Sequence, residues 1–476
     1  MLFNSFEFAL FFPTVFLLYW IFGGKNIKYQ NYLILFSSYF FYGLWDWRFL
    51  FLIFLSSLVD YIIGLKIYNT SSQTSRKQLL YFSLFWNLGI LFSFKYFNFF
   101  TENFYTLFQL DYSSSSFSFL NIILPVGLSF YTFQTLSYSI DIYRERIKPT
   151  SEFVEFLCFV SFFPQLVAGP IERASSLLPQ FLKKRNFEIN MAKEGLRQIL
   201  WGLFKKIVVA DNLAIAVNLI YSDPNDYQSL ELFYALILFY FQIYCDFSGY
   251  ADIAIGSAKL LGFKLSVNFR LPHFSRSIPE FWRRWNITVS VWFRDYVFIP
   301  YLKNKSRTEK NFIIATFLTF ILIGLWHGAA WTFIFFGLFH AILMIIYRYI
   351  SIPTRINFTS SFTYYLTNGT FIAICFFFLI ISSAFFRGES IQNSFLILKK
   401  IFLFIPDENF ESLIGLKVLF IPFLLLLEIL TLKKDYPFFK LEQHFSKPIR
   451  WCIYYLFIFL IIRYGGPQES FIYFQF

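Results

Sequence analysis

Charged residues and cysteines are both scarce in this chain. Only 15% of the 476 residues are charged, whereas a water-soluble domain carries about 25%. The cysteines are far apart, mostly within apolar stretches, and show no C-x-x-C spacing: Cys158, Cys245, Cys375 and Cys452. We therefore expect no structural zinc site and interpret these thiols as buried and inert.

Two further features are missing. The N-terminal stretch MLFNSFEFALFFPTVFLLYW has no basic n-region and no small-residue cleavage site, so we interpret it as a retained helix and not as a removed signal peptide. No internal repeat of the transporter kind is visible, and the Ser113–Ser116 run is interpreted as a flexible loop and not as a domain linker. One membrane domain, 1–476, is therefore expected.

Apolar residues are abundant: 57% of the chain is hydrophobic and 24% is aromatic, with 73 Phe. So much Phe indicates apolar filling and not a cofactor-stacking site. A stretch of about 20 apolar residues can cross a bilayer as a helix, whereas a barrel would show short alternating segments. The sequence predicts an all-α polytopic protein with these candidate spans: Phe6–Phe22, Tyr29–Leu44, Phe49–Leu65, Leu79–Phe99, Phe119–Ile140, Ile199–Tyr221, Leu230–Gly249, Asn311–Trp326, Trp331–Tyr349, Thr370–Phe386, Gly415–Leu432 and Trp451–Ile462.

The net charge of +12 follows the positive-inside rule and does not indicate nucleic-acid binding. Basic residues gather in three short loops, placed in the cytoplasm: Lys25 and Lys28; Lys66, Arg76 and Lys77; Arg144, Arg146 and Lys148. The intervening Trp45–Trp47 turn and the loop Thr101–Ser118 carry few basic residues and are placed outside. This pattern predicts an extracytoplasmic N-terminus.

The middle of the chain is more polar than its two ends. The block Phe269–Leu302 interleaves arginines, among them Arg283, Arg284 and Arg294, with tryptophans. Charged or irregular backbone at membrane depth occurs only where protein or a wet cavity shields it. We expect cytoplasm-facing interfacial helices or a re-entrant wall here. The alternative is that these side chains only anchor a helix at the lipid headgroups.

Among the four histidines, His327 has the most distinctive setting. It lies in an apolar run, Phe312–Tyr347, that is too long for a single span, and we predict a break at Gly328–Ala330. A polar ring at such a junction favours a functional role, the alternative being a packing histidine. His340 is predicted to be a packing residue. His273 and His444 are predicted in interfacial loops, and no two histidines have the i,i+4 spacing of a helical metal pair.

Two carboxylates, Asp246 and Asp252, lie in the apolar segment YCDFSGYADIAIG. Intramembrane carboxylates can bind cations or relay protons, as a transporter requires. They can equally pair with basic side chains, and we favour pairing with the nearby arginines.

Several ordered motifs within 164–340 carry a family resemblance. Ala168–Ala174 (AGPIERA), Tyr244–Phe263, the block Phe269–Leu302 and Gly324–Phe333 (GLWHGAAWTF) resemble the membrane-bound O-acyltransferase family. Within it they are similar to the bacterial branch of alginate O-acetyltransferases and teichoic acid D-alanine-transfer proteins. The opening LFNSFEFALFFP and the closing FIYFQF, Phe471–Phe476, also resemble the alginate-type branch.

The resemblance implies a ring of roughly 11–12 membrane helices, with re-entrant or interfacial helices, around a central tunnel. His327 matches the histidine of that tunnel and would act as general base. Asn286 stands where this branch usually has a histidine, and would donate to the developing oxyanion. Arg283, Arg284 and Arg294 would hold the phosphates of the donor.

The closing motif resembles the C-terminal motif of a small partner protein in the D-alanine branch. That partner is implicated in relaying the acyl group. Tyr473 is therefore a candidate acyl relay, the alternative being an aromatic anchor at the interface.

The predicted function is O-acyl transfer from a cytoplasmic thioester to a polysaccharide outside the membrane, with acetyl as the favoured acyl group. The donor would be acetyl-CoA or an acyl-carrier thioester, with no bound cofactor and no metal. The expected setting is a bacterial inner membrane, with a periplasmic or surface O-acetyltransferase as partner. Alginate, cellulose, peptidoglycan or another glycan remain open as acceptor. A transporter and a non-catalytic scaffold of exopolysaccharide assembly are the competing hypotheses.

Overall fold

The computed structural model describes residues 1–24, 26–110, 123–167, 169–350, 361–404, 415–432 and 434–474. Within these ranges the regular structure is helical and contains no strand, which confirms the prediction of an all-α protein. The Ser113–Ser116 run, the second half of the loop Thr101–Ser118, and the last two residues of the closing motif lie outside the described residues.

Six described helices are long and apolar enough to cross a membrane. They are Arg48–Asn69, Gln73–Leu107, Ser229–Leu260, Glu309–His327, Trp331–Tyr349 and Thr367–Arg387. Other predicted spans consist of shorter pieces: the stretch Ile199–Tyr221 contains the end of one helix, a π-helical segment and nearly all of a further helix. The polytopic character is thus confirmed, while the ring of 11–12 spans and its tunnel stay predictions.

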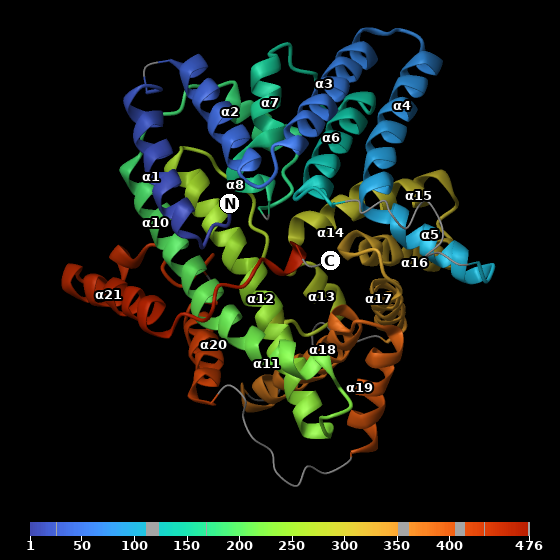
Figure 1. Cartoon of the computed structure of the whole chain (residues 1–476), viewed down its shortest axis with the longest axis vertical. Helices are drawn as coiled ribbons and strands as arrows, with labels where there is room; N and C mark the ends of the chain where they lie inside the picture. Colours follow the sequence, from blue (N-terminus) through green and yellow to red (C-terminus); the bar gives the residue numbers. More distant parts are fainter. Residues whose placement is uncertain are drawn as a thin grey trace. The chain divides into compact units, whose positions relative to one another are not determined.

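The chain separates into two compact units, and α10 and α12 contribute residues to both. The single-domain organisation stays a prediction. The first unit contains residues Met1–Ile199 and Ile253–Ser266. Its elements (Figure 1) are α1 (Phe6–Ile21), α2 (Ile27–Gly43), α3 (Arg48–Asn69), α4 (Gln73–Leu91), the π-helix η1 (Phe92–Tyr96), α5 (Phe97–Leu107), α6 (Leu128–Tyr143), α7 (Phe153–Ser161), α8 (Phe163–Leu166), α9 (Ala174–Phe181) and most of α10 (Ile189–Leu203).

A buried carboxylate joins three helices of this unit. Asp60 on α3 accepts hydrogen bonds from Ser83 and Asn87 on α4, at 2.6 and 2.7 Å, and from Ser139 on α6 at 3.0 Å. Polar groups inside a membrane protein are stable only where they find such partners. The bonds therefore fix α3, α4 and α6 against one another.

The AGPIERA motif belongs to the same unit and fixes a loop. The carboxylate of Glu172 accepts hydrogen bonds from the backbone N–H and hydroxyl of Ser266, and from the hydroxyl of Ser176 at 2.7 Å. The described part of this motif therefore ties the start of α9 to the segment that follows α12.

The second unit contains residues Leu200–Asp252 and Val267–Phe476. Its elements are the π-helix η2 (Phe204–Ala210), α11 (Asp211–Ser222), α12 (Ser229–Leu260), η3 (Pro272–Phe274), α13 (Ile278–Trp282), α14 (Ile287–Phe293), the π-helix η4 (Arg294–Phe298), α15 (Ile299–Asn304), α16 (Glu309–His327), α17 (Trp331–Tyr349), α18 (Ser361–Arg387), α19 (Ile391–Leu403), η5 (Gly415–Leu419), α20 (Phe420–Leu430), η6 (Leu441–Gln443), α21 (Lys447–Tyr464) and η7 (Ile472–Phe474). The candidate catalytic residues all lie in this unit.

The prediction of buried thiols holds for three of the four cysteines. Cys158, Cys245 and Cys375 are buried and free, whereas Cys452 on α21 is exposed. The prediction was wrong for Cys452 because an apolar helix in a membrane protein also presents side chains to the outside of the protein.

Candidate active site

His327 is the last residue of α16, and a short extended link follows it. Gly328 has φ −166°, and α17 begins at Trp331 after Ala330. The predicted break at Gly328–Ala330 is therefore confirmed, as is the position of His327 at the junction of two helices.

Glycines let α16 and α17 pack with their backbones in contact. A Cβ atom on Gly324 would lie 2.2 Å from the carbonyl oxygen of Phe333, and one on Gly337 would lie 2.3 Å from that of Phe320. Neither position accepts a side chain without movement of the backbone. The two helices therefore form a closely packed hairpin that holds His327 at its turn.

Aromatic rings from three helices surround the imidazole, which is 2% exposed. The ring centroids of Trp326, Phe386 and Phe336 lie 4.8, 4.9 and 5.7 Å from that of His327. Such an enclosure excludes bulk water and strengthens electrostatic interactions inside it.

Tyr473 brings a hydroxyl group to the histidine. Its phenol oxygen lies 2.9 Å from Nδ1 of His327, and its ring packs on Phe247 of α12 at 4.7 Å between centroids. Burial, and secondarily the charge of Asp246, raise the pKa of the Tyr473 phenol above its ordinary value. The phenol is therefore neutral and needs a base to become a nucleophile.

The C-terminal tail that carries Tyr473 is the red segment following α21, and it crosses α12 (Figure 1). The backbone N–H of Ile472 donates to Asp246 Oδ2 on α12 at 2.7 Å. The Lys206 ammonium donates to the carbonyl oxygen of Glu469 at 3.1 Å. The tail is thus bonded to elements far from it in sequence.

The predicted pairing of Asp246 and Asp252 with basic side chains is confirmed, but the predicted partners were wrong. Asp246 is paired with Lys206 at 2.7 Å and Asp252 with Lys205 at 2.6 Å, where arginines were expected. Both lysines lie in the π-helix η2, inside a stretch that we interpreted as a regular apolar span. A π-helix has i→i+5 hydrogen bonds and therefore another periodicity than an α-helix, so α-helical periodicity does not show which way its side chains point.

Asn286 lies in the second unit, directly before α14, in the left-handed backbone region at φ 41°. It is 2% exposed, and neither polar atom of its amide has a hydrogen-bond partner among the described residues. Buried amides nearly always have partners, and an exception calls for an explanation such as a catalytic role or a bound molecule. No hydrogen bond within the described ranges joins Asn286 to His327.

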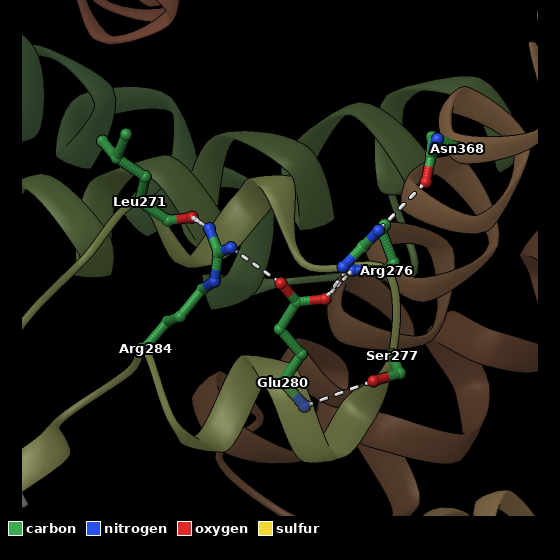
Figure 2. Close-up of polar contacts among 6 residues, drawn as sticks. All are labelled: Leu271, Arg276, Ser277, Glu280, Arg284 and Asn368. Carbon is green, nitrogen blue, oxygen red and sulfur yellow. Dashed lines mark hydrogen bonds and ion pairs between the residues drawn. The ribbon is translucent and has the colours of Figure 1, made fainter. Parts of the chain in front are cut away.

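The arginines of the polar block differ in their exposure and in their ion pairs. Figure 2 shows Glu280 between two of them: Arg284 Nη2 lies 2.7 Å from Glu280 Oε1, and the backbone N–H of Arg276 donates to Oε2 at 2.9 Å. Burial alone would raise the Glu280 pKa, but hydrogen bonds from Arg276 and the charge of Arg284 hold it below its ordinary value. Arg283 and Arg294 are exposed, and Arg294 contacts Asp295 at 2.7 Å.

A small cavity that the sequence did not reveal lies beside the His327 enclosure and shares Phe336 and Phe386 with it. Its volume is about 30 Å³, and its lining is Phe239, Tyr240, Ile243, Phe281, Trp285, Phe336, His340, Leu379, Ser382, Ser383 and Phe386. Nδ1 of His340 accepts a hydrogen bond from the Trp282 indole at 3.3 Å. Nε2 of His340 and the Tyr240 hydroxyl meet no partner in the described part of the chain.

His273 lies in the short 3₁₀ turn η3, and its predicted position at the membrane interface stays a prediction. It is 4% exposed, and its Nε2 lies 3.0 Å from Oε2 of Glu428, whose other oxygen accepts from the Tyr244 hydroxyl at 2.6 Å. The local sequence shows a proline-containing loop but not the carboxylate on α20 that pairs with it. His444 is exposed, as expected.

Comparison with known proteins agrees with the site. The model of the membrane-bound O-acyltransferase family matches residues 32–387. A peptidoglycan O-acetyltransferase of Helicobacter pylori is 34% identical over an alignment of 434 positions that covers 84% of this chain and 79% of that protein. A protein of Pseudomonas aeruginosa named a probable alginate O-acetylase is 33% identical over an alignment of 458 positions that covers 94% of this chain and 83% of that protein.

A more distant relative, a teichoic acid D-alanyltransferase of Bacillus subtilis, is 31% identical over an alignment of 239 positions that covers 48% of this chain and 60% of that protein. The family match extends from α2 to the end of α18 and includes the histidine junction. The chain is therefore a multi-pass membrane protein that belongs to the membrane-bound O-acyltransferase family, and an O-acyltransferase.

Proposed function

We propose that this protein transfers an acetyl group from a cytoplasmic thioester to the hydroxyl groups of a polysaccharide outside a bacterial inner membrane. The observation that carries the mechanism is the contact between the Tyr473 hydroxyl and Nδ1 of His327 at 2.9 Å. The names of the relatives support the chemistry, since one acetylates peptidoglycan and another is named for alginate.

In the first step His327 accepts the phenol proton while the Tyr473 oxygen attacks the thioester carbonyl carbon. The carbon–sulfur bond breaks, the sulfur takes the proton from the imidazolium, and the acyl group becomes an ester of Tyr473. General-base assistance contributes about 10²–10⁴-fold to such a step. The raised pKa of the phenol makes this assistance necessary.

In the second step an acceptor hydroxyl attacks the tyrosine ester, which restores the phenol and leaves the acyl group on the acceptor oxygen. A periplasmic or surface O-acetyltransferase partner would deliver this acyl group to the polysaccharide. The positive-inside pattern supports an extracytoplasmic N-terminus.

The acceptor glycan and the choice between acetyl-CoA and an acyl-carrier thioester are open within this proposal.

Asn286 is proposed as the group that stabilises the oxyanion formed on the carbonyl oxygen. Its amide N–H groups are buried and without partner within the described ranges, so they cost little to redirect towards a substrate. Preorganised donors of this kind contribute about 10²–10³-fold to acyl transfer.

The charges and the cavity support the remaining parts of the proposal. Arg283 and Arg294 are exposed and are proposed to hold the donor phosphates. Arg284 and Arg294 each pair with one carboxylate, but the Arg284 side chain is less exposed, at 33% against 57%, and would contribute less. A volume of about 30 Å³ beside His327 is larger than the roughly 10–15 Å³ that one water needs by the same measure, and it suits a short acyl group.

The transporter hypothesis loses support from the same structure. It required Asp246 and Asp252 to bind cations or protons, and both carboxylates are paired with buried lysines. A bound substrate cation would first have to displace a lysine ammonium.

The test is to trap the acyl-tyrosine. Purified protein would be incubated with isotopically labelled acetyl-CoA, and its C-terminal peptide analysed by mass spectrometry. We expect one acetyl group on Tyr473 in the wild type and none in Tyr473→Phe or His327→Gln. Acetylation of surface glycans, compared between the wild type and a deletion strain, would identify the acceptor. Full glycan acetylation by both variants would refute the proposal.

A further inference from the structure

One carboxylate, that of Asp246, contacts both a buried lysine and the C-terminal tail. Its Oδ1 lies 2.7 Å from the Lys206 ammonium, and its Oδ2 accepts from the backbone N–H of Ile472 at 2.7 Å. Ile472 directly precedes Tyr473. The position of the relay hydroxyl is therefore only one residue away from a charged anchor.

Three oxygen atoms lie within hydrogen-bond distance of the Lys206 ammonium. This number equals the three N–H donors of an ammonium group. The oxygens are Oδ1 of Asp246 at 2.7 Å, Oδ1 of Asp211 at 2.8 Å and the carbonyl oxygen of Glu469 at 3.1 Å. The side chains of Lys206, Asp211 and Asp246 are only 1%, 3% and 4% exposed. Such buried charges are stable only while they stay paired.

The tail also packs closely against η2, α11 and α12. The backbone N–H of Gly466 donates to the carbonyl oxygen of Ile207 at 3.0 Å, and a Cβ on Gly466 would lie 2.7 Å from the carbonyl carbon of Asp211. Phe471 is fully buried, with its ring 4.6 Å from that of Tyr250. Contacts from Gly466 to Ile472 thus follow η2, α11 and α12.

We propose that Lys206 and Asp246 are positioning residues, which hold the tail so that the Tyr473 oxygen meets Nδ1 of His327. The inference rests on the proposed acyl relay and adds residues that touch neither donor nor acceptor. It also explains why Lys206 and Asp246, and not two apolar residues, occupy these buried positions: their charges hold the tail in a single register. Misplacement of a reacting group by about 1 Å can cost 10²-fold in rate.

Lys205 provides a matched control. It is the neighbouring residue of η2 and is equally buried, but its ammonium contacts Asp252 at 2.6 Å and Ser248 at 2.8 Å. Its replacement by methionine removes a buried ion pair between the same two elements, while the bonds from Lys206 and Asp246 to the tail remain.

Three variants test the anchor. Lys206→Met removes the charge, and Asp246→Asn keeps the shape but cannot serve both partners as an acceptor. Ile472→Pro removes the N–H that donates to Asp246, replaces the buried Ile472 side chain and leaves all charges in place; Ile472 begins the 3₁₀ helix η7, whose ideal φ suits proline. Because it changes only the tail, this variant remains informative even where the charge variants fail to fold.

Two measurements are made on each detergent-purified variant. The first is the rate of Tyr473 acetylation from labelled acetyl-CoA, with the KM for the donor. The second is trimming of the tail by a carboxypeptidase, which reports its seating independently of chemistry. We expect about 10²-fold slower acetylation, an unchanged KM and faster trimming in all three variants. Lys205→Met should stay within about threefold of the wild-type rate.

Wild-type acetylation rates in Asp246→Asn and Ile472→Pro would overturn the proposal, and so would an equal loss in Lys205→Met. If the wild type carries no acyl group on Tyr473, the proposed relay fails by itself. The trimming assay then decides the positioning role, and equal protection of the tail in the wild type and Asp246→Asn would refute it.

Discussion

The phenol oxygen of Tyr473 lies 2.9 Å from Nδ1 of His327, although 146 residues separate the two in sequence. The histidine comes from the turn of the α16–α17 hairpin, and the tyrosine from a tail bonded to α12. A nucleophile within hydrogen-bond distance of its base is the arrangement that acyl transfer requires.

If the two residues act as one unit, their losses will not add. We expect His327→Gln and Tyr473→Phe each to slow acyl transfer by about 10²–10⁴-fold, and the double variant to be no slower than the slower single variant. Initial rates of transfer to the acceptor measure all three. Losses that multiply in the double variant would show that the residues act independently.

The glycines of the hairpin predict a loss of stability. Gly324→Ala places a methyl group against the Phe333 carbonyl, and overpacking of this kind costs about 1–3 kcal/mol. Gly369→Ala on α18 is the control, since a Cβ there meets no atom within 4 Å, and it should stabilise the helix by about 0.5–1 kcal/mol. Thermal unfolding in detergent compares them. An unchanged midpoint for Gly324→Ala would contradict the described contact.

Asn286 predicts a loss of rate without a loss of stability. Asn286→Gly removes the amide but accepts the left-handed backbone, so we expect kcat to fall by about 10²–10³-fold at an unchanged unfolding temperature. Asn286→Ala should lose as much activity and also about 1–2 kcal/mol of stability, because alanine is strained there. Normal kcat in the glycine variant would exclude the amide from the reaction.

The cavity predicts the acyl chain length. Leu379→Ala enlarges it, and one methylene in an apolar pocket is worth about 1–3 kcal/mol in discrimination. We expect the ratio of kcat/KM for butyryl over acetyl donors to rise at least about tenfold. Leu343→Ala on α17, equally a buried leucine but outside the cavity lining, serves as control. The same ratio in both variants would mean that the acyl group binds elsewhere.

The exposed arginines predict a salt-sensitive donor affinity. Arg294→Gln should raise the KM for acetyl-CoA by about tenfold at low ionic strength, and by less at high salt, since exposed charges are screened. Arg276→Gln is the control, because Arg276 is likewise exposed and ion-paired but is not proposed to contact the donor. A KM that is equal in the two variants would argue against phosphate binding by Arg294.

The sequence could predict the histidine junction because two simple quantities define it. The apolar run around His327 is too long for one span, and glycine and alanine mark where it breaks. The pairing of Asp246 with Lys206 was not predictable in the same way. It depends on a π-helix within an apolar stretch, and the periodicity of that stretch reads as a regular α-helix.

Side-chain packing limits what the sequence reveals elsewhere. The cavity beside His327 is formed where α12, α13, α17 and α18 meet, and no local pattern in any one helix indicates it. The burial of His273 depends on Glu428, which lies 155 positions away. Tyr473 could be predicted as a candidate relay only through the family resemblance, since a terminal aromatic run by itself is typical of an interface anchor.

The interlocked glycines of α16 and α17 determine which part of the catalytic pair can move. Each helix places a carbonyl group where the other lacks a side chain, so sliding of one along the other would bring backbone atoms into collision. The proposed base, His327, is thereby held in a fixed position. Any movement within the proposed pair would therefore have to come from the tail, and it would first have to break the Lys206 ion cluster and the hydrogen bond from Ile472 to Asp246.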